Sequence, residues 1–222
     1  YSISYDTYDN KIVPNGITFD VSHGGEVAKV TLFGGLGVQH LYSALAGVAV
    51  GATLDIKLDK MTKALHKHES PRGRMKILHG VKNSVLIDDS YNSSPLALIE
   101  ALNTLELIET KGRKIAVLGD MMELGRFSPD EHKKAGERVA QVVSKLFTVG
   151  VRARGIAEGA QNAGMSEKSI FQFEDSAKAG KELELMISEG DVGLVKGSQS
   201  IRTERVMEEI MAEPERKDEL LV

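Results

Sequence analysis

The feature of this sequence that most constrains its fold is a regular alternation of short apolar runs and longer helical patterns after residue 77. Each run is rich in Val, Ile, Leu or Phe and is bounded by polar residues or glycine, as β-strands are. Strands that alternate with helices predict a mostly parallel sheet with flanking helices, which is a Rossmann-like α/β layer. The five predicted strands are SVLID (84–88), KIAVLG (114–119), KLFTVG (145–150), SIFQF (169–173) and DVGLVKG (191–197).

Capping residues indicate where several helices of this region begin. Ser94, which a proline follows, is predicted to cap the helix after the first strand. Ser128 opens a segment with capping-box spacing. Asp175 or Ser176 is predicted to cap a third helix, and Ser200 is predicted to cap the last one.

The first part of the chain has a different pattern. Residues 1–33 predict β-structure, in which GITFDV and VAKVTLF flank the turn-forming SHGGE and predict a hairpin. The stretches VQHLYSALAGVAVG (38–51) and KLDKMTKALHKH (57–68) predict two helices. The polar ESPRGR (69–74), with its proline and glycine, is the predicted linker.

These patterns predict three parts of the chain: residues 1–74, residues 75–212 and a charged tail, residues 213–222, that we expect to fray. The chain starts without Met, so we expect a fragment of a longer protein. We also expect it to act as a monomer.

Composition excludes several classes of function. The net charge of -4 argues against a nucleic-acid or anionic-membrane surface. The absence of cysteine excludes disulfides, a thiolate nucleophile and a Cys-ligated zinc site, and it fits a reducing compartment such as the cytoplasm. No signal peptide is visible, and the most apolar stretch, LYSALAGVAVGATL, is too short to span a bilayer.

Acids, glycines and hydroxyls gather where the predicted strands end, which is where ligands bind in open α/β sheets. The first strand ends in the adjacent acids Asp88 and Asp89, inside VLIDDSYNSSP. Either these residues simply end a strand and open a helix, or the carboxylates face a cation or the hydroxyls of a ribose.

Three further stretches are candidates for the same cleft. VLGDMMELG (117–125) carries Asp120 and Glu123, and LVKGSQS (194–200) offers a lysine, backbone N–H groups and a hydroxyl suited to a carboxylate or phosphate. LVKGSQS is not a P-loop, because the upstream glycine is missing. PRGR (71–74) places Arg74 on the linker, where it can reach a phosphate. Each stretch also has a purely structural explanation, as does His132, which we interpret as a structural residue of a helix.

The order of these motifs resembles that of the Mur ligase family. The resemblance covers residues 34–212 and is strongest over 73–206. Within the family, it is closest to the ligases that add D-alanyl-D-alanine to UDP-N-acetylmuramoyl-tripeptide. The motifs that carry it are GR (73–74), IDDSYNSSP (87–95), AVLGDMMELG (116–125), SPDEHKKAG (128–136) and LVKGSQSIRTERV (194–206).

The resemblance implies an ATP-dependent acid–amino-acid ligase of peptidoglycan precursor synthesis that works through an acyl phosphate. Residues 1–74 would then be the hairpin and helix end of a P-loop-type central ATPase domain, and residues 75–212 the C-terminal domain. ATP and Mg²⁺ would bind mainly to parts absent from this chain, and no metal ligand is assigned within it. Since the chain lacks a P-loop, we expect it to have no ligase activity alone.

The resemblance also implies roles for particular residues. Arg74 would approach the γ-phosphate. The nucleotide would be bound by Asp89, Tyr91, Asn92, His40 and Ser43. The incoming dipeptide would be bound by Ser93, Asp120, Lys196, Gly197 and Ser198. This sequence departs from the family where Gln39, His40 and Ser43 stand in place of His, Asn and Asn, and where Gln199 replaces Arg.

Two alternatives stay open. One is another Mur or folylpolyglutamate-type ligase, which would share the fold and use a different substrate. The other is a non-catalytic module that binds a nucleotide or a peptide, which the missing P-loop favours.

Overall fold

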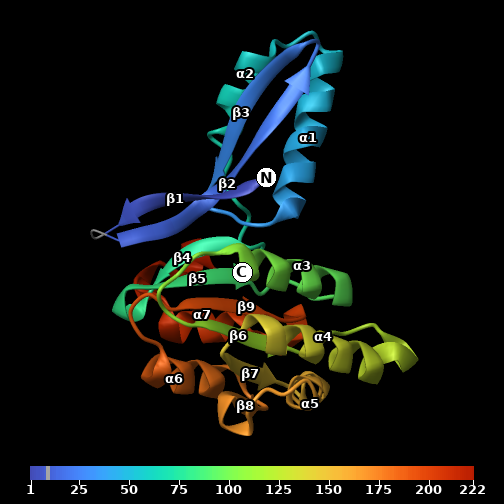
Figure 1. The fold of residues 1–222 in the computed structure, drawn as a ribbon. Helices are drawn as coiled ribbons and strands as arrows, with labels where there is room; N and C mark the ends of the chain where they lie inside the picture. The colour runs from blue at the N-terminus through green and yellow to red at the C-terminus, as the bar shows by residue number, and fades with distance from the viewer. Residues whose placement is uncertain (9–10) are drawn as a thin grey trace.

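The computed structural model describes residues 1–8 and 11–222, which form two units (Figure 1). The N-terminal unit contains a three-stranded sheet and two helices, and it stands on a larger α/β unit with a six-stranded sheet. The chain passes from one unit to the other through residues 66–75. The α/β class and the mostly parallel sheet predicted from the sequence are confirmed.

The N-terminal unit is an antiparallel sheet covered by two helices. Its strands, in the order β1-β2-β3, are β1 (Ser2–Tyr8), β2 (Lys11–His23) and β3 (Glu26–Phe33). The predicted hairpin is confirmed, since β2 and β3 pair up to His23 and Glu26 around two glycines with positive φ. Both predicted helices are present as α1 (Val38–Thr53) and α2 (Leu58–Leu65).

The six-stranded sheet has the order β4-β5-β9-β6-β7-β8. All five predicted strands are present: β5 (Ser84–Asp89), β6 (Lys114–Gly119), β7 (Lys145–Val149), β8 (Ile170–Phe173) and β9 (Val192–Lys196). They run parallel to one another. The edge strand β4 (Lys76–Gly80) was not predicted. It is short and pairs antiparallel with β5 through a tight turn at Val81–Asn83.

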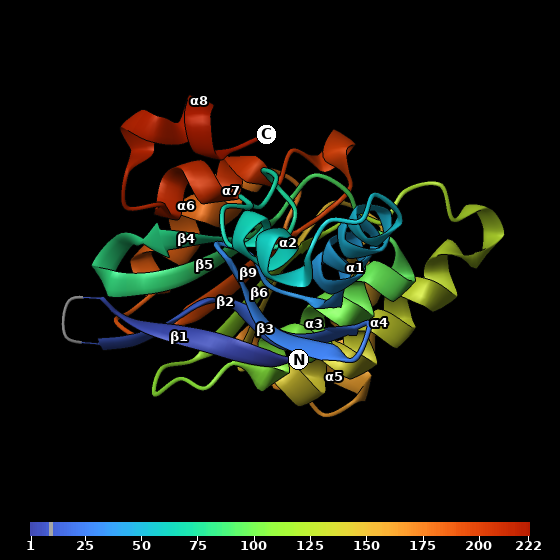
Figure 2. The same ribbon diagram turned by 90° about the horizontal axis from the view of Figure 1, so that it is seen from above.

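Alternate residues of each strand face opposite sides of the sheet, and each side has its own helices. Ile87, Leu118 and Leu146 pack with α3 (Pro95–Leu107), α4 (Ser128–Val142) and α5 (Arg154–Asn162). Leu86 and Val117 pack with α6 (Ser176–Met186) and α7 (Glu204–Ile210). Figure 2 shows the two groups of helices on opposite sides of the strands.

Two of the predicted helix caps are confirmed. The Ser94 hydroxyl accepts a bond from the Ala97 N–H at the start of α3, and the Asp175 carboxylate accepts one from the Lys178 N–H at the start of α6.

The other two predicted caps are wrong. Ser128 already has helical φ and ψ, because a 3-10 turn at Gly125–Phe127 leads directly into α4. Ser200 lies inside a 3-10 turn, Gln199–Ile201, and α7 begins only at Glu204 after a left-handed Arg202.

The prediction that the tail frays is also wrong. A 3-10 turn, Pro214–Arg216, leads into the short helix α8 (Lys217–Leu220). Leu221 is buried with Leu78 and Met211 on the α7 side of the sheet. The tail is therefore anchored by an apolar side chain near its end, which its overall charge concealed.

Among the described residues, no helix has both the length and the apolar character needed to cross a membrane.

Candidate functional site

The candidate site lies at the carboxyl ends of β5, β9 and β6, which are neighbours in the sheet. Asp89 of β5 stands opposite Lys196 of β9, and Lys196 stands opposite Leu118 of β6. Three stretches that are far apart in the sequence, IDDSYN, VLGDMM and VKGS, therefore meet at one edge, as predicted from their places at the ends of parallel strands.

Asp88 is fully buried and binds the backbone of the linker. One of its oxygens accepts a hydrogen bond from the Gly73 N–H at 3.1 Å, and the other accepts one from the Ser90 N–H at 3.2 Å. Burial raises the pKa of Asp88 from 3.8 to about 6, although the bonds from Ser90 and Gly73 oppose this rise. Asp88 thus attaches the end of β5 to the linker.

Asp89 makes a second attachment to the linker. Its Oδ1 accepts a hydrogen bond from the Met75 N–H at 3.1 Å, and its Oδ2 pairs with Lys196 Nζ at 2.6 Å. The Lys196 ammonium also donates to the Asn92 carbonyl at 2.8 Å and is 2% exposed. Two adjacent acids are tolerated here because each carboxylate has its own donors, and one of them has a cation.

Arg74 and Tyr91 form the exposed wall of this edge. The Arg74 guanidinium lies over the Tyr91 ring, 4.2 Å from its centroid, and both side chains are exposed. The stack holds the guanidinium over the strand ends, where an anion from solvent can reach it.

The two candidate residues on α1 differ in their connection to the site. His40 is buried, and its Nε2 donates to the Arg74 carbonyl at 3.0 Å. Burial lowers the pKa of His40, and the bond to Arg74 opposes this effect. Ser43 is exposed, and its hydroxyl donates to the Gln39 carbonyl one turn earlier. The structure therefore joins His40 to the site through the linker and gives Ser43 no such contact among the described residues.

Asp120 and Ser198 bind neighbouring loops to each other. The Asp120 carboxylate accepts a bond from the Ala153 N–H at 2.7 Å, and its carbonyl accepts one from the Ser198 N–H. The Ser198 hydroxyl in turn accepts a bond from the Met122 N–H at 3.0 Å. Both residues are buried, so in this structure they fix the loops that follow β6, β7 and β9.

His132 has the structural role expected of it, because it binds the backbone of Met121, next to Asp120. Its Nε2 accepts a hydrogen bond from the Met121 N–H at 3.0 Å, so this nitrogen carries no proton. Its Nδ1 then donates to the Ser128 carbonyl at 2.7 Å. The ring is fixed in one neutral tautomer and holds the loop that carries Asp120.

The remaining candidates line the same edge. Asn92 is exposed, and its side-chain oxygen accepts a bond from the N–H of the buried Ser93. Gly197 packs so closely that a Cβ there would lie 2.7 Å from Thr203 Cγ2.

Sequence reasoning did not identify the Gly73 and Met75 N–H groups as the hydrogen-bond donors to the two acids. No local signal identifies them, because every residue other than proline has a backbone N–H.

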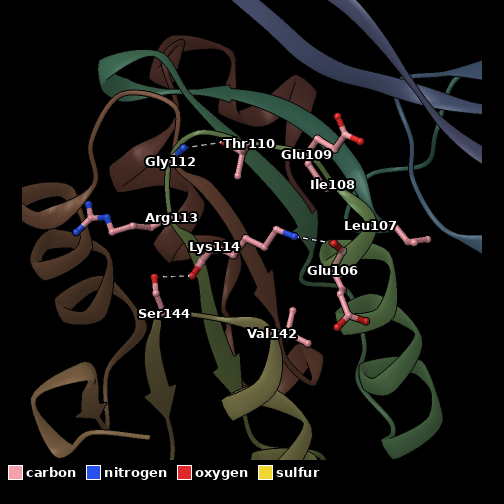
Figure 3. A pocket seen from close by; sticks show the side chains of 10 residues that line it. All are labelled: Glu106, Leu107, Ile108, Glu109, Thr110, Gly112, Arg113, Lys114, Val142 and Ser144. Carbon is pink, nitrogen blue, oxygen red and sulfur yellow. Dashed lines mark hydrogen bonds between the residues drawn. The ribbon is translucent and has the colours of Figure 1, made fainter.

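A pocket of about 600 Å³ lies at the opposite edge of the sheet, where β6 begins (Figure 3). Both of its cationic side chains are already engaged: Lys114 donates to the Glu106 carbonyl, and Arg113 pairs with Asp191. We therefore place the candidate site at the carboxyl edge. The pocket is lined by Glu106, Leu107, Ile108, Glu109, Thr110, Gly112, Arg113, Lys114, Val142 and Ser144.

Within residues 1–8 and 11–222, no three His, Asp or Glu side chains are grouped so that they could hold a metal ion.

Comparison with known proteins identifies the family. Residues 73–199 match the family described as Mur ligase, glutamate ligase domain. The UDP-N-acetylmuramoyl-tripeptide–D-alanyl-D-alanine ligase of Bacillus subtilis is 30% identical over 182 residues, which are 81% of this chain and 39% of that protein. The chain thus spans about two fifths of the length of this curated relative.

Solved structures agree with this result. A MurF ligase from Thermotoga maritima in complex with ADP is 26% identical with a TM-score of 0.72, over 93% of this chain and 44% of that chain. MurF from Acinetobacter baumannii is 26% identical with a TM-score of 0.75, over 87% and 42%. Since the family match covers more than half of the sequence and carries the strand-end motifs of the site, the chain belongs to the Mur ligase family.

Proposed function

We propose that this chain is part of an ATP-dependent ligase that adds D-alanyl-D-alanine to UDP-N-acetylmuramoyl-tripeptide in peptidoglycan precursor synthesis. One observation carries the proposal: the motifs that meet at the carboxyl edge belong to a chain whose curated relatives bear that name. We further propose that it acts in the cytoplasm, as a monomer, on small-molecule substrates and without nucleic acid or membrane partners.

The reaction forms an amide in two steps. The γ-phosphoryl group of ATP passes to the tripeptide carboxylate, which becomes an acyl phosphate as ADP leaves. The dipeptide amine then attacks the acyl carbon, gives up a proton and displaces phosphate. Positioning and charge neutralisation account for most of such catalysis. Arg74 is the proposed catalytic residue of this chain, because its guanidinium is exposed above the strand ends and can bind a phosphate.

Asp89 is proposed to bind the ribose. An ionised carboxylate has about four acceptor positions, and Met75 and Lys196 take one each. Positions are therefore left for two hydroxyls, while Lys196 Nζ stays paired with Oδ2 at 2.6 Å. Tyr91 and Asn92 would line the nucleotide site, with His40 and Ser43 approaching it from α1.

Lys196, Gly197 and Ser198 are proposed to hold the dipeptide carboxylate beside Ser93 and Asp120. An ammonium group has three N–H bonds, and among the described residues two of those of Lys196 are used. The third, with the backbone that follows β9, would meet a carboxylate.

ATP carries Mg²⁺ in most phosphoryl transfers, and the described residues contain no group of three His, Asp or Glu side chains placed to hold a metal ion. We assign the ion no step here. Because the sequence has no P-loop, we expect residues 1–222 to release no phosphate from ATP in the presence of D-alanyl-D-alanine. Dipeptide-dependent phosphate release by the purified chain would contradict this expectation.

Calorimetry tests the dipeptide assignment. D-alanyl-D-alanine, L-alanyl-L-alanine and ATP are titrated separately into the purified chain. Selective binding of the D,D-dipeptide supports the proposal, whereas equal binding of the L,L-dipeptide would contradict it.

The role of Arg74 is tested with the same ATP titration. Arg74→Ala should weaken ATP binding about tenfold or more, because it removes a charged hydrogen-bond donor to phosphate. Arg205→Ala is the matched control, since it removes the same charge from an exposed position of α7. If the two variants bind ATP with equal affinity, Arg74 does not contribute to the nucleotide site.

A further inference from the structure

The C-terminal segment, residues 214–222, contacts the linker between the two units. Arg72 Nη1 donates to the Asp218 carbonyl at 2.8 Å and to the Leu221 carbonyl at 3.3 Å. Next to it, Gly73 is so close to the end of the chain that a Cβ there would lie 2.5 Å from Val222 Cγ2. The linker is therefore bound from two sides: by the acids at the end of β5 and by the last residues of the chain.

The segment itself is fixed to the α/β unit. Leu221 is 4% exposed and packs in the same core as Leu78 and Met211. Arg216 pairs with both Glu213 and Glu219, which ties the two ends of the 3-10 turn and α8 together. An anchored segment can hold Arg72 in place, whereas a frayed tail could not.

Charge also favours this contact. Arg72 donates to carbonyls in the last turn of the chain, where a helix end carries partial negative charge. The pKa of Glu219 is lowered mainly by Arg216, and the nearby charges of Lys76 and Arg72 add to the effect. The segment thus presents negative charge to the positively charged linker.

The linker is also hydrogen-bonded to the N-terminal unit, so its position affects that unit. The Arg74 carbonyl accepts a bond from His40 on α1, and the Met75 carbonyl accepts one from the Leu36 N–H. Met75 is buried and has a φ of 53°, a left-handed conformation that a non-glycine residue keeps only when its surroundings enforce it. On the side of the α/β unit, Asp89 binds the Met75 N–H, and the neighbouring Gly73 is held by Asp88 and by the Tyr91 N–H, which donates to the Gly73 carbonyl. Arg72 adds its contacts with the C-terminal segment.

We propose that residues 214–222 form a brace, acting through Arg72, that positions the linker, and with it Arg74 and the N-terminal unit. Arg72 is a positioning residue in this arrangement: it makes its contacts with the brace and acts on the cleft through the linker backbone. The inference concerns the conformation of the chain and stands whether or not the ligase assignment is correct.

Amide hydrogen exchange of the whole chain tests the brace. Arg72→Ala should speed exchange at Gly73 and Met75 about tenfold, the effect of losing a charged donor to two carbonyls. Exchange at Val117 and Val195, in the centre of the sheet, should stay unchanged, which separates loss of the brace from general destabilisation. Arg72→Lys should restore much of the protection, because an ammonium can also donate to two carbonyls.

A second measurement reports the orientation of the units. The sequence has no cysteine, so Val50→Cys on α1 and Leu185→Cys on α6, both at exposed positions, can be spin-labelled as a pair. The distance distribution between the labels should broaden in Arg72→Ala and in a chain that ends at Leu220. Arg205→Ala, the matched loss of an exposed arginine, should leave it unchanged.

The outcomes are distinct. Faster exchange at the linker together with a broader distance distribution, and with an unchanged sheet, is the result that the brace requires. If both Arg72→Ala and the shortened chain keep the exchange rates and the distance distribution of the parent, the segment does not position the linker and the proposal is overturned.

Discussion

At the scale of single residues, the notable feature is a carboxyl group that is buried without a cation. Among the described residues, Asp88 is held by the N–H groups of Gly73 and Ser90 and pairs with no cation, whereas its neighbour Asp89 pairs with Lys196. The hydrogen bonds to Asp88 offset only part of the desolvation penalty of its charged form, so burial raises its pKa to about 6. A group of this kind makes the stability of the fold depend on pH in the mildly acidic range.

The sign of this dependence follows from the direction of the shift. The folded chain holds a proton on Asp88 up to about pH 6, while the unfolded chain releases it near 3.8. The contribution of Asp88 to stability is thus fully present below pH 3.8 and is lost as the pH rises through 6. A shift of this size corresponds to roughly 3 kcal/mol.

Asp88→Asn should remove this dependence, since an amide does not titrate. Urea unfolding of the parent and of the variant between about pH 4 and pH 7.5 measures it. The free energy of unfolding of the parent should fall relative to that of the variant across this range, because the parent loses its proton there. Two curves that stay parallel would mean that Asp88 is already ionised at pH 4.

At the scale of elements, the sequence correctly predicted the strands and helix caps that depend on interactions between nearby residues. The five parallel strands follow from apolar runs, and Ser94 and Asp175 cap helices within three residues of themselves. Ser200 failed as a cap because the turn that contains it is set by a distant contact, a hydrogen bond from the Ser176 hydroxyl to the Ile201 carbonyl. The strand β4 was missed because its pairing with β5, rather than its own composition, makes it a strand.

The two serines provide a matched test of this distinction. Ser94→Ala should lower the free energy of unfolding by about 1 kcal/mol, because the Ala97 N–H loses its partner. Ser200→Ala should cost less than about 0.5 kcal/mol, because the residue is exposed and caps no helix. Denaturant unfolding of the two variants checks both values, and a loss below about 0.5 kcal/mol for Ser94→Ala would show that its cap contributes little.

At the scale of the whole molecule, the sequence predicted which stretches meet but not how they bind one another. The strand order brings Asp89, Lys196 and Asp120 to one edge, as expected for a parallel sheet. Their partners in this structure are mostly backbone groups of other loops, such as the N–H groups of Met75 and Ala153. Such partners have no signature in the sequence, because the tertiary fold alone selects them.

The ion pair between Asp89 and Lys196 joins β5 to β9, and the two residues are 107 positions apart in the sequence. We expect its removal to lower the free energy of unfolding. Lys196→Met should destabilise the fold by about 3–5 kcal/mol, because it leaves a buried carboxylate without its cation. The double variant with Asp89→Asn should recover part of this loss, since neither charge is then left unpaired. Thermal and denaturant unfolding measure both effects.

A surface pair serves as the control for this experiment. Lys63 and Asp59 form an ion pair at 2.8 Å on α2, with side chains that are 74% and 75% exposed. Lys63→Met should change the stability by less than about 1 kcal/mol. If Lys196→Met costs no more than this control, the buried pair does not hold the strand ends together.

The double attachment of the linker to Asp88 and Asp89 has a consequence for how the two units can move. The attached N–H groups belong to Gly73 and Met75, only two residues apart, and both acceptors are buried carboxylates. Breaking one bond leaves a buried acceptor poorly satisfied and strains the other bond, so the two are expected to break together. Reorientation of the N-terminal unit would then be a switch between discrete arrangements, with a barrier between them, and not a continuous swing.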